Sequence, residues 1–180
     1  MHDHEFDWAT GHRSEKDALL HIDPQISHFK ADHRLLMLNG PNLNLLGRRD
    51  PTQYGTFTLV DVETITRRSI NAQGFALDCF QTNHEGELVD IIQAARSRYT
   101  GIILNAGALT HYSYALRDAI DACKVPTMEV HISDIALREP FRQLSVIHPV
   151  CVGQVKGLGL DSYIVGARDL ISYIVGQKKG

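Results

Sequence analysis

The chain has 180 residues, of which 43% are hydrophobic, and its formal net charge at pH 7 is -3. This length and apolar content suit one globular domain with a sizeable core. The slightly acidic balance argues against nucleic acid or an anionic membrane surface as a partner.

The cysteines and the N-terminal residues bear on cellular location. Cys79, Cys123 and Cys151 are far apart in apolar contexts, and none belongs to a C-x-x-C pair that would suit zinc or redox chemistry. Such a sparse, odd set favours a reducing compartment. No stretch reaches the length of a membrane span, and the acidic start MHDHEFDW lacks the apolar segment of a secretory signal. We therefore expect a cytoplasmic protein.

Residues 1–33 differ in composition from the rest of the chain. They hold seven of the 21 acidic residues and only three of the 18 Lys and Arg residues. They also hold six of the ten histidines, at His2, His4, His12, His21, His28 and His33. Their spacing is not that of paired zinc ligands, so we predict a poorly ordered His-rich extension rather than a metal site. One short helix is a candidate at 15–20, and residues 34–180 are expected to form a single catalytic α/β domain.

From Arg34 onward, strand and helix patterns alternate. Short apolar runs predict strands at 35–38, 75–81, 101–105, 127–132 and 150–154. Apolar residues at helical spacing predict helices at 59–70, 88–95, 115–123 and 160–174, with a short helical turn near 138–143. Thr58 and Asp61 resemble a capping box before the first helix.

Five alternations of strand and helix indicate the fold class. They predict an α/β protein with a flavodoxin-like, five-stranded parallel sheet and helices on both faces. Five strands suit this order better than a six-stranded dinucleotide-binding sheet. Ligands of such sheets bind beyond the carboxyl ends of the strands, so the residues that follow each strand are the candidates for a site.

Three of the five predicted strand ends carry amide, imidazole and guanidinium groups. Each group has an ordinary interpretation on its own: Asn-Gly-Pro-Asn is a common turn, and Arg48 and Arg49 are typical of a solvated pair. The fifth strand leads to Gly157 and Gly159, which do not form a full G-x-G-x-x-G. If the sheet is right, the other groups converge on one crevice: Asn39, Asn42, Arg49 and Tyr54, then Asn105, Thr110 and His111, then Glu129, His131, Ser133, Arg138 and Arg142.

These residue types restrict the chemistry. The sequence lacks clustered carboxylates, metal-ligand spacing, a Walker loop and a G-x-S-x-G elbow. It does place Tyr54 near two arginines, and a guanidinium stabilises a phenolate. Such a tyrosine can abstract a proton next to a carbonyl, while amides and an ordered water hold the enolate and a histidine protonates the leaving group. Backbone amides at Ile132 and Ser133, with Arg142, can bind the ligand, which suits a cofactor-free β-elimination of water from a small hydroxylated keto acid.

Four sequence blocks carry a family resemblance. LNGPNLNLLGRRDPTQYG, ILNAGALTHYSYALRDAI, EVHISD with REPFR, and GQVKGLGLDSY resemble type II 3-dehydroquinate dehydratase over roughly residues 34–175. The resemblance implies a flavodoxin-like fold, no metal or cofactor, and a homo-oligomer, the dodecamer built from trimers. It also implies conversion of 3-dehydroquinate to 3-dehydroshikimate by anti elimination through an enolate. This reaction serves both aromatic biosynthesis and quinate breakdown, and the sequence favours neither.

The resemblance implies roles for individual residues. Tyr54 matches the base, Arg49 the arginine that stabilises it, Asn42 the residue that positions the enolate-binding water, and His131 the acid, with Glu129 as its partner. The matched substrate-binding positions are Asn105, His111, Ile132, Ser133, Arg142 and Asp118, the last reaching the site from a neighbouring subunit.

Two other classes compete with this interpretation. A flavodoxin-like signalling module would need an acidic pocket with a phosphoacceptor Asp, and a flavin-binding module would be yellow. A nucleotide-dependent oxidoreductase would show the dinucleotide fingerprint, which this chain lacks. The strand ends carry Asn, Arg and His instead, which favours the dehydratase.

Overall fold

The structure, a computed structural model, describes residues 33–177. Five parallel strands form one sheet in the order β2-β1-β3-β4-β5. The predicted flavodoxin-like α/β fold is therefore confirmed. The strands are β1 (Arg34–Asn39), β2 (Ala76–Gln81), β3 (Gly101–Asn105), β4 (Thr127–His131) and β5 (Gly153–Lys156).

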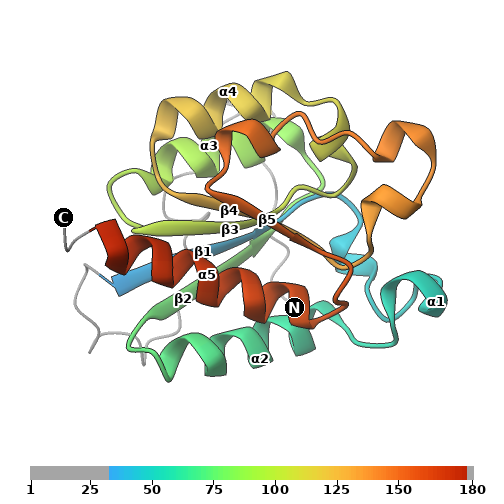
Figure 1. Cartoon of the computed structure of the whole chain (residues 1–180), viewed down its shortest axis with the longest axis horizontal. Coiled ribbons are helices and arrows are strands. Elements are labelled where there is room, and N and C mark those ends of the chain that lie inside the picture. The colour runs from blue at the N-terminus through green and yellow to red at the C-terminus, as the bar shows by residue number, and fades with distance from the viewer. Residues whose placement is uncertain (1–32, 178–180) are drawn as a thin grey trace, which may run out of the picture.

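Helices cover both faces of the sheet, with α2 and α5 on one side and α3 and α4 on the other (Figure 1). Two buried apolar clusters fill the space between the sheet and these helix pairs. In β1, Leu35 and Met37 belong to one cluster while Leu36 and Leu38 belong to the other. Because side chains alternate along a strand, this short all-apolar run is buried on both faces. The helices are α2 (Leu59–Asn71), α3 (Glu85–Ala95), α4 (Tyr114–Cys123) and α5 (Asp161–Gln177).

The predicted capping box starts α2. The Thr58 N–H donates to Asp61 Oδ2 at 2.8 Å, and the Asp61 N–H donates to Thr58 Oγ1 at 3.2 Å. Two otherwise unpaired N–H groups at the helix start are thereby satisfied.

The fifth strand differs from its prediction. It pairs with β4 only from Gly153 onward and not from residue 150. The preceding residues, His148–Val150, form a 3-10 turn that contains Pro149. The N–H groups of Val150 and Cys151 donate within this turn, to the carbonyls of Ile147 and His148, so they are not available to a strand ladder and the predicted start at 150–152 is wrong.

The predicted loop after β1 contains a short helix, α1 (Pro51–Tyr54), that sequence periodicity does not reveal. Asp50 caps it by accepting the Thr52 N–H at 2.9 Å, and Pro51 occupies the first turn, where its missing N–H costs nothing. Gly55, with φ of 73°, ends the helix in a conformation that other residues rarely adopt. This local chemistry places Tyr54 at the end of a short helical turn beyond the sheet.

The ends of β1 and β3 approach each other closely. Asn39 lies opposite Asn105 in the sheet, and the Gly40 N–H donates to the Asn105 carbonyl at 2.7 Å. A Cβ on Gly40 would lie 2.5 Å from the Ala106 carbonyl oxygen, so only glycine fits this position. The two polar loops that follow these strands are therefore held side by side.

Some predictions fall outside the described part of the chain. The candidate helix at 15–20 and all of the predicted extension except His33 lie there, so the division into 1–33 and 34–180 stays a prediction.

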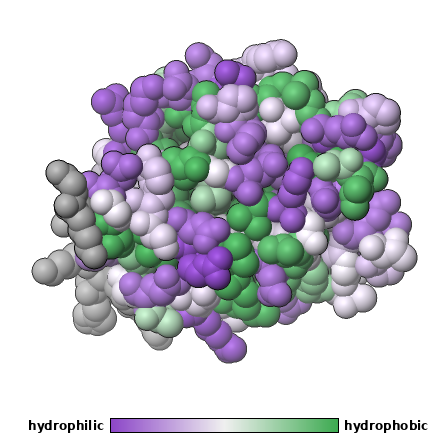
Figure 2. Space-filling model, in the orientation of Figure 1, coloured by the Kyte–Doolittle hydropathy of each residue, from purple (hydrophilic) through white to green (hydrophobic). Residues whose placement is uncertain are grey.

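Between residues 33 and 177, no helix is long and apolar enough to cross a membrane. Hydrophilic residues are interspersed with hydrophobic ones over the face in Figure 2.

Candidate active site

A cleft lies beyond the carboxyl ends of β1, β3 and β4, where the sequence predicts a site. The space in and above it, which includes open solvent, is about 560 Å³. Nine of the ten predicted site residues line it: Asn42, Arg49, Tyr54, Asn105, His111, His131, Ile132, Ser133 and Arg142. The tenth, Asp118, is exposed on α4 and does not line the cleft of its own chain.

The cleft is suited to an anion. Arg49, Arg138 and Arg142 line it together with His111 and His131, and none of the described lining residues is acidic. Since the chain as a whole has a net charge of -3, this concentration of cations is local. A negatively charged ligand is favoured over a neutral one.

The hydroxyl of Tyr54 lies between two guanidinium groups. It accepts a hydrogen bond from Arg49 Nη2 at 2.8 Å and one from Arg138 Nη1 at 2.7 Å. The Arg49 guanidinium also lies 3.7 Å from the centroid of the tyrosine ring. The phenol oxygen is therefore the acceptor of two charge-assisted hydrogen bonds from cationic donors.

Arg138 is a site residue to which sequence reasoning assigns no role. It is 84 positions from Tyr54, in the segment after β4, and the signals for it in the sequence are its place beyond a strand end and the block REPFR, which it begins. Glu139 lies between Arg138 and Arg142, with its carboxylate 3.5 Å and 3.0 Å from their respective Nε atoms. The closer contact is an ion pair whose orientation leaves the Arg142 Nε–H without a well-aligned acceptor.

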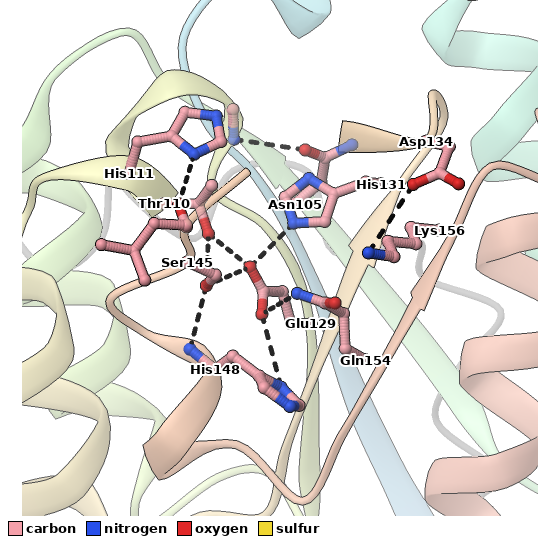
Figure 3. A network of polar contacts seen from close by, with 12 residues as sticks. Asn105, Thr110, His111, Glu129, His131, Asp134, Ser145, His148, Gln154 and Lys156 are labelled. Carbon is pink, nitrogen blue, oxygen red and sulfur yellow. Dashed lines mark hydrogen bonds and ion pairs between the residues drawn. The ribbon is translucent and has the colours of Figure 1, made fainter. Parts of the chain in front are cut away.

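The imidazole of His131 is held by a buried carboxylate (Figure 3). His131 Nε2 lies 2.7 Å from Glu129 Oε1, and Glu129 is fully buried. This leaves Nδ1 as the ring nitrogen available to a ligand in the cleft. The carboxylate accepts further hydrogen bonds from Ser145 Oγ at 2.8 Å, Gln154 Nε2 at 2.8 Å and the Thr110 hydroxyl, and His148 Nδ1 is 3.7 Å away.

The pKa of Glu129 reflects two opposing effects. Burial alone would raise it, but the hydrogen bonds from His131, Thr110 and Ser145, with the charge of His131, outweigh burial and lower the pKa below the usual value for a glutamate. Glu129 is therefore a carboxylate at neutral pH, and it holds the His131 imidazole by its Nε2 atom. Sequence reasoning identifies Glu129 as this partner but misses Ser145 and Gln154, whose contacts depend on tertiary structure.

His111 is fixed in one tautomer. Its Nδ1 lies 2.8 Å from the carbonyl oxygen of Leu144, which can only accept, so Nδ1 carries the proton. Burial, with the positive charges of His131 and Arg142, lowers the pKa of His111 despite the opposing effect of that carbonyl. His111 is therefore neutral at pH 7, and its Nε2 can accept a hydrogen bond from a ligand hydroxyl.

Two further contacts fix backbone at the cleft. The carbonyls of His131 and Ile132 accept hydrogen bonds from Gly157 and Gly159 N–H at 3.3 Å and 3.0 Å. The glycine pair after β5 therefore supports the cleft backbone without lining the cleft.

Asn42 has a left-handed conformation, with φ of 68°, and its N–H donates to the Asn83 side chain at 2.9 Å.

Comparison with known proteins agrees with this geometry. The family model for dehydroquinase class II matches residues 33–171. A 3-dehydroquinate dehydratase from Bacillus subtilis (strain 168) is 48% identical over 144 residues, which cover 80% of this chain and 97% of that protein. One from Bacillus pumilus (strain SAFR-032) is 50% identical over 137 residues, which cover 76% of this chain and 93% of that protein.

Solved structures are also similar. A type II dehydroquinase from Butyrivibrio crossotus DSM 2876 superposes with a TM-score of 0.76 at 40% identity, covering 79% of this chain and 99% of that one. A type II dehydroquinase from Propionibacterium acnes gives a TM-score of 0.75 at 37% identity, covering 81% and 99%. The matched stretch includes every residue that lines the cleft. This chain therefore belongs to the class II dehydroquinase family.

Proposed function

We propose that the protein is a hydro-lyase that eliminates water from 3-dehydroquinate to give 3-dehydroshikimate, with Tyr54 as base and His131 as acid. One observation carries the assignment of the base: the Tyr54 oxygen accepts hydrogen bonds from two guanidinium groups at the cleft. The relatives at about half identity are named 3-dehydroquinate dehydratases, which supports the substrate.

The cleft suits the substrate, which carries a carboxylate, a ketone and several hydroxyls. The carboxylate is bound by the backbone amides of Ile132 and Ser133 and by the amide of Asn105. His111 accepts a hydrogen bond from a substrate hydroxyl, and Arg142 donates one. The three arginines at the cleft supply the attraction for the negative charge.

The proton is removed by Tyr54. As a phenolate, it takes a proton from the carbon next to the ketone, and the electron pair moves to the ketone oxygen to give an enolate. A water positioned by Asn42 donates a hydrogen bond to that oxygen. Arg49 and Arg138 favour the phenolate that performs this step, because their charges are 2.8 and 2.7 Å from its oxygen.

The hydroxyl leaves with help from His131. As the enolate collapses, the carbon–oxygen bond breaks and the departing hydroxyl takes the proton from His131 Nδ1, so water is released. Glu129 stays ionised and stabilises the imidazolium that precedes this step. The resemblance to type II 3-dehydroquinate dehydratase implies an anti elimination, in which the proton and the hydroxyl leave from opposite faces of the ring.

No metal has a role in this mechanism, because a tyrosine and a histidine supply the base and the acid. Between residues 33 and 177, no group of three or more His, Cys, Asp or Glu side chains could hold a metal ion.

The three cysteines are free thiols. These thiols support the cytoplasmic location inferred from the sequence.

The assay with 3-dehydroquinate tests the function. The product is a conjugated enone, so ultraviolet absorbance is expected to rise when purified protein is added to the substrate. Because Tyr54 and His131 need no metal, the rate with EDTA should equal the rate without it. No rise above a protein-free control would contradict the function, and inhibition by EDTA would contradict the cofactor-free mechanism.

The contribution of Arg138 is tested by Arg138→Ala. A hydrogen bond to a charged group contributes about 1.5–3 kcal/mol, so kcat is expected to fall by roughly 10- to 150-fold. Arg48→Ala is the matched control, since Arg48 is exposed and does not line the cleft. If Arg138→Ala and Arg48→Ala had the same kcat, Arg138 would have no part in the reaction.

We infer that Asp118 acts in a neighbouring subunit of a dodecamer built from trimers. Asp118 is exposed on α4 and outside the cleft of its own chain, which supports this role. Exposed apolar side chains in the segments next to the cleft supply a surface for such a neighbour: Tyr112, Tyr114, Leu137, Phe141 and Leu144. Light scattering during turnover should detect an oligomer, and a fully active monomer would contradict the shared site.

A further inference from the structure

A tyrosine hydroxyl lies buried beneath the cleft, where the mechanism gives it no part. Tyr163 of α5 is fully buried in the apolar cluster that contains α2 and α5. Its ring has the apolar surroundings that a phenylalanine would also accept. Its hydroxyl reaches the sheet between Asn39 and Asn105, the last residues of β1 and β3.

The directions of the hydrogen bonds in this group follow from one backbone donor. The Gly107 N–H lies 3.2 Å from Asn105 Oδ1 and can only donate, so the amide oxygen must face Gly107. The Asn105 Nδ2 group then donates to the Tyr163 oxygen at 2.8 Å. The hydroxyl of Tyr163 in turn donates to Asn39 Oδ1 at 2.7 Å.

The tyrosine keeps its proton in this position. Burial is the main cause that raises the pKa of Tyr163 above the usual value, and it outweighs the hydrogen bond from Asn105. The chain from Gly107 to Asn39 is thus one-directional, and Asn105 is held at both ends of its amide. One hydrogen on Asn105 Nδ2 is left over, and Asn105 lines the cleft.

We propose that Tyr163 is a positioning residue, which holds the Asn105 amide so that its remaining N–H points to an acceptor oxygen of the ligand. Without the hydroxyl, only the 3.2 Å hydrogen bond from the Gly107 N–H would hold the amide, which could then turn its oxygen toward an anionic ligand, a repulsive arrangement. This inference rests on the proposed function, because the ligand oxygen belongs to the substrate of that reaction.

A matched pair of variants separates positioning from core packing. Tyr163→Phe removes only the buried hydroxyl. Tyr99→Phe removes a comparable one, since the Tyr99 hydroxyl donates to the buried Asp78 carboxylate at 2.9 Å, and neither Tyr99 nor Asp78 lines the cleft. Removal of a hydroxyl with a purely structural role changes Tm and the fraction of folded enzyme but leaves KM unchanged.

For Tyr163→Phe, KM is expected to rise about tenfold while kcat stays within about twofold, because Asn105 binds the substrate equally in the ground and transition states. Tyr99→Phe should lower Tm and leave KM at the wild-type value. An unchanged KM in Tyr163→Phe, or an equal rise in Tyr99→Phe, would overturn the proposal. Failure of the proposed function is distinguishable, because the wild-type protein would then not turn over the substrate.

A double-mutant cycle with Asn105→Ala shows whether Tyr163 acts through Asn105. If it does, adding Tyr163→Phe to Asn105→Ala should raise KM by no more than about twofold, whereas independent effects would multiply and overturn the proposal. If Tyr163→Phe does not fold, Asn39→Ala tests the other end of the chain, since it removes the acceptor of the Tyr163 hydroxyl. A raised KM in that variant supports the proposal, and a wild-type KM contradicts it.

Discussion

The contact of the Tyr54 oxygen with two guanidinium groups is the interaction on which the cleft depends. It joins the segment after β1, which carries Arg49 and Tyr54, to the segment after β4, which carries Arg138. Two cationic donors occupy both lone pairs of the phenol oxygen. The same contacts hold the two segments together at the cleft, which all three residues line.

The side of the cleft that carries His131 has the opposite electrostatics. There the charge is a carboxylate, Glu129, which lies inside the protein and is satisfied by His131, Thr110, Ser145 and Gln154. A buried charge without such partners would be strongly destabilising, so the network is also a structural element that joins β4 and β5 to the loops beside them. Cationic donors therefore surround the Tyr54 oxygen, while a buried carboxylate lies behind the His131 imidazole in the same cleft.

Much of this arrangement is predictable from sequence because it follows from the parallel sheet. The all-apolar runs of β1 and β3 identify strands buried on both faces, and parallel strands bring their carboxyl ends to one edge. Residues that follow different strands are therefore predicted to share one cleft, and nine of the ten predicted site residues do line it. The family resemblance, which the comparisons confirm, identifies the chemistry that the individual residues leave open.

The parts that sequence does not reveal depend on contacts over long distances or on very short elements. Helix α1 has four residues, too few for a periodic pattern, so the sequence predicts only a loop at this position. The contact of Arg138 with Tyr54 and the bonds of Ser145 and Gln154 to Glu129 leave no local pattern, because each joins segments that only the fold brings together. The late start of β5 reflects the 3-10 turn at His148–Val150, which the apolar run of the sequence conceals.

The most direct test of the central claim is kcat for Tyr54→Phe with 3-dehydroquinate. The variant keeps the ring against which Arg49 packs and loses only the oxygen. Tyr173→Phe is the matched control, because Tyr173 is a partly exposed residue of α5 that does not line the cleft. If Tyr54 is the base, kcat falls by roughly 10²- to 10⁴-fold in Tyr54→Phe and is unchanged in Tyr173→Phe. A Tyr54→Phe enzyme with near wild-type kcat would contradict the account.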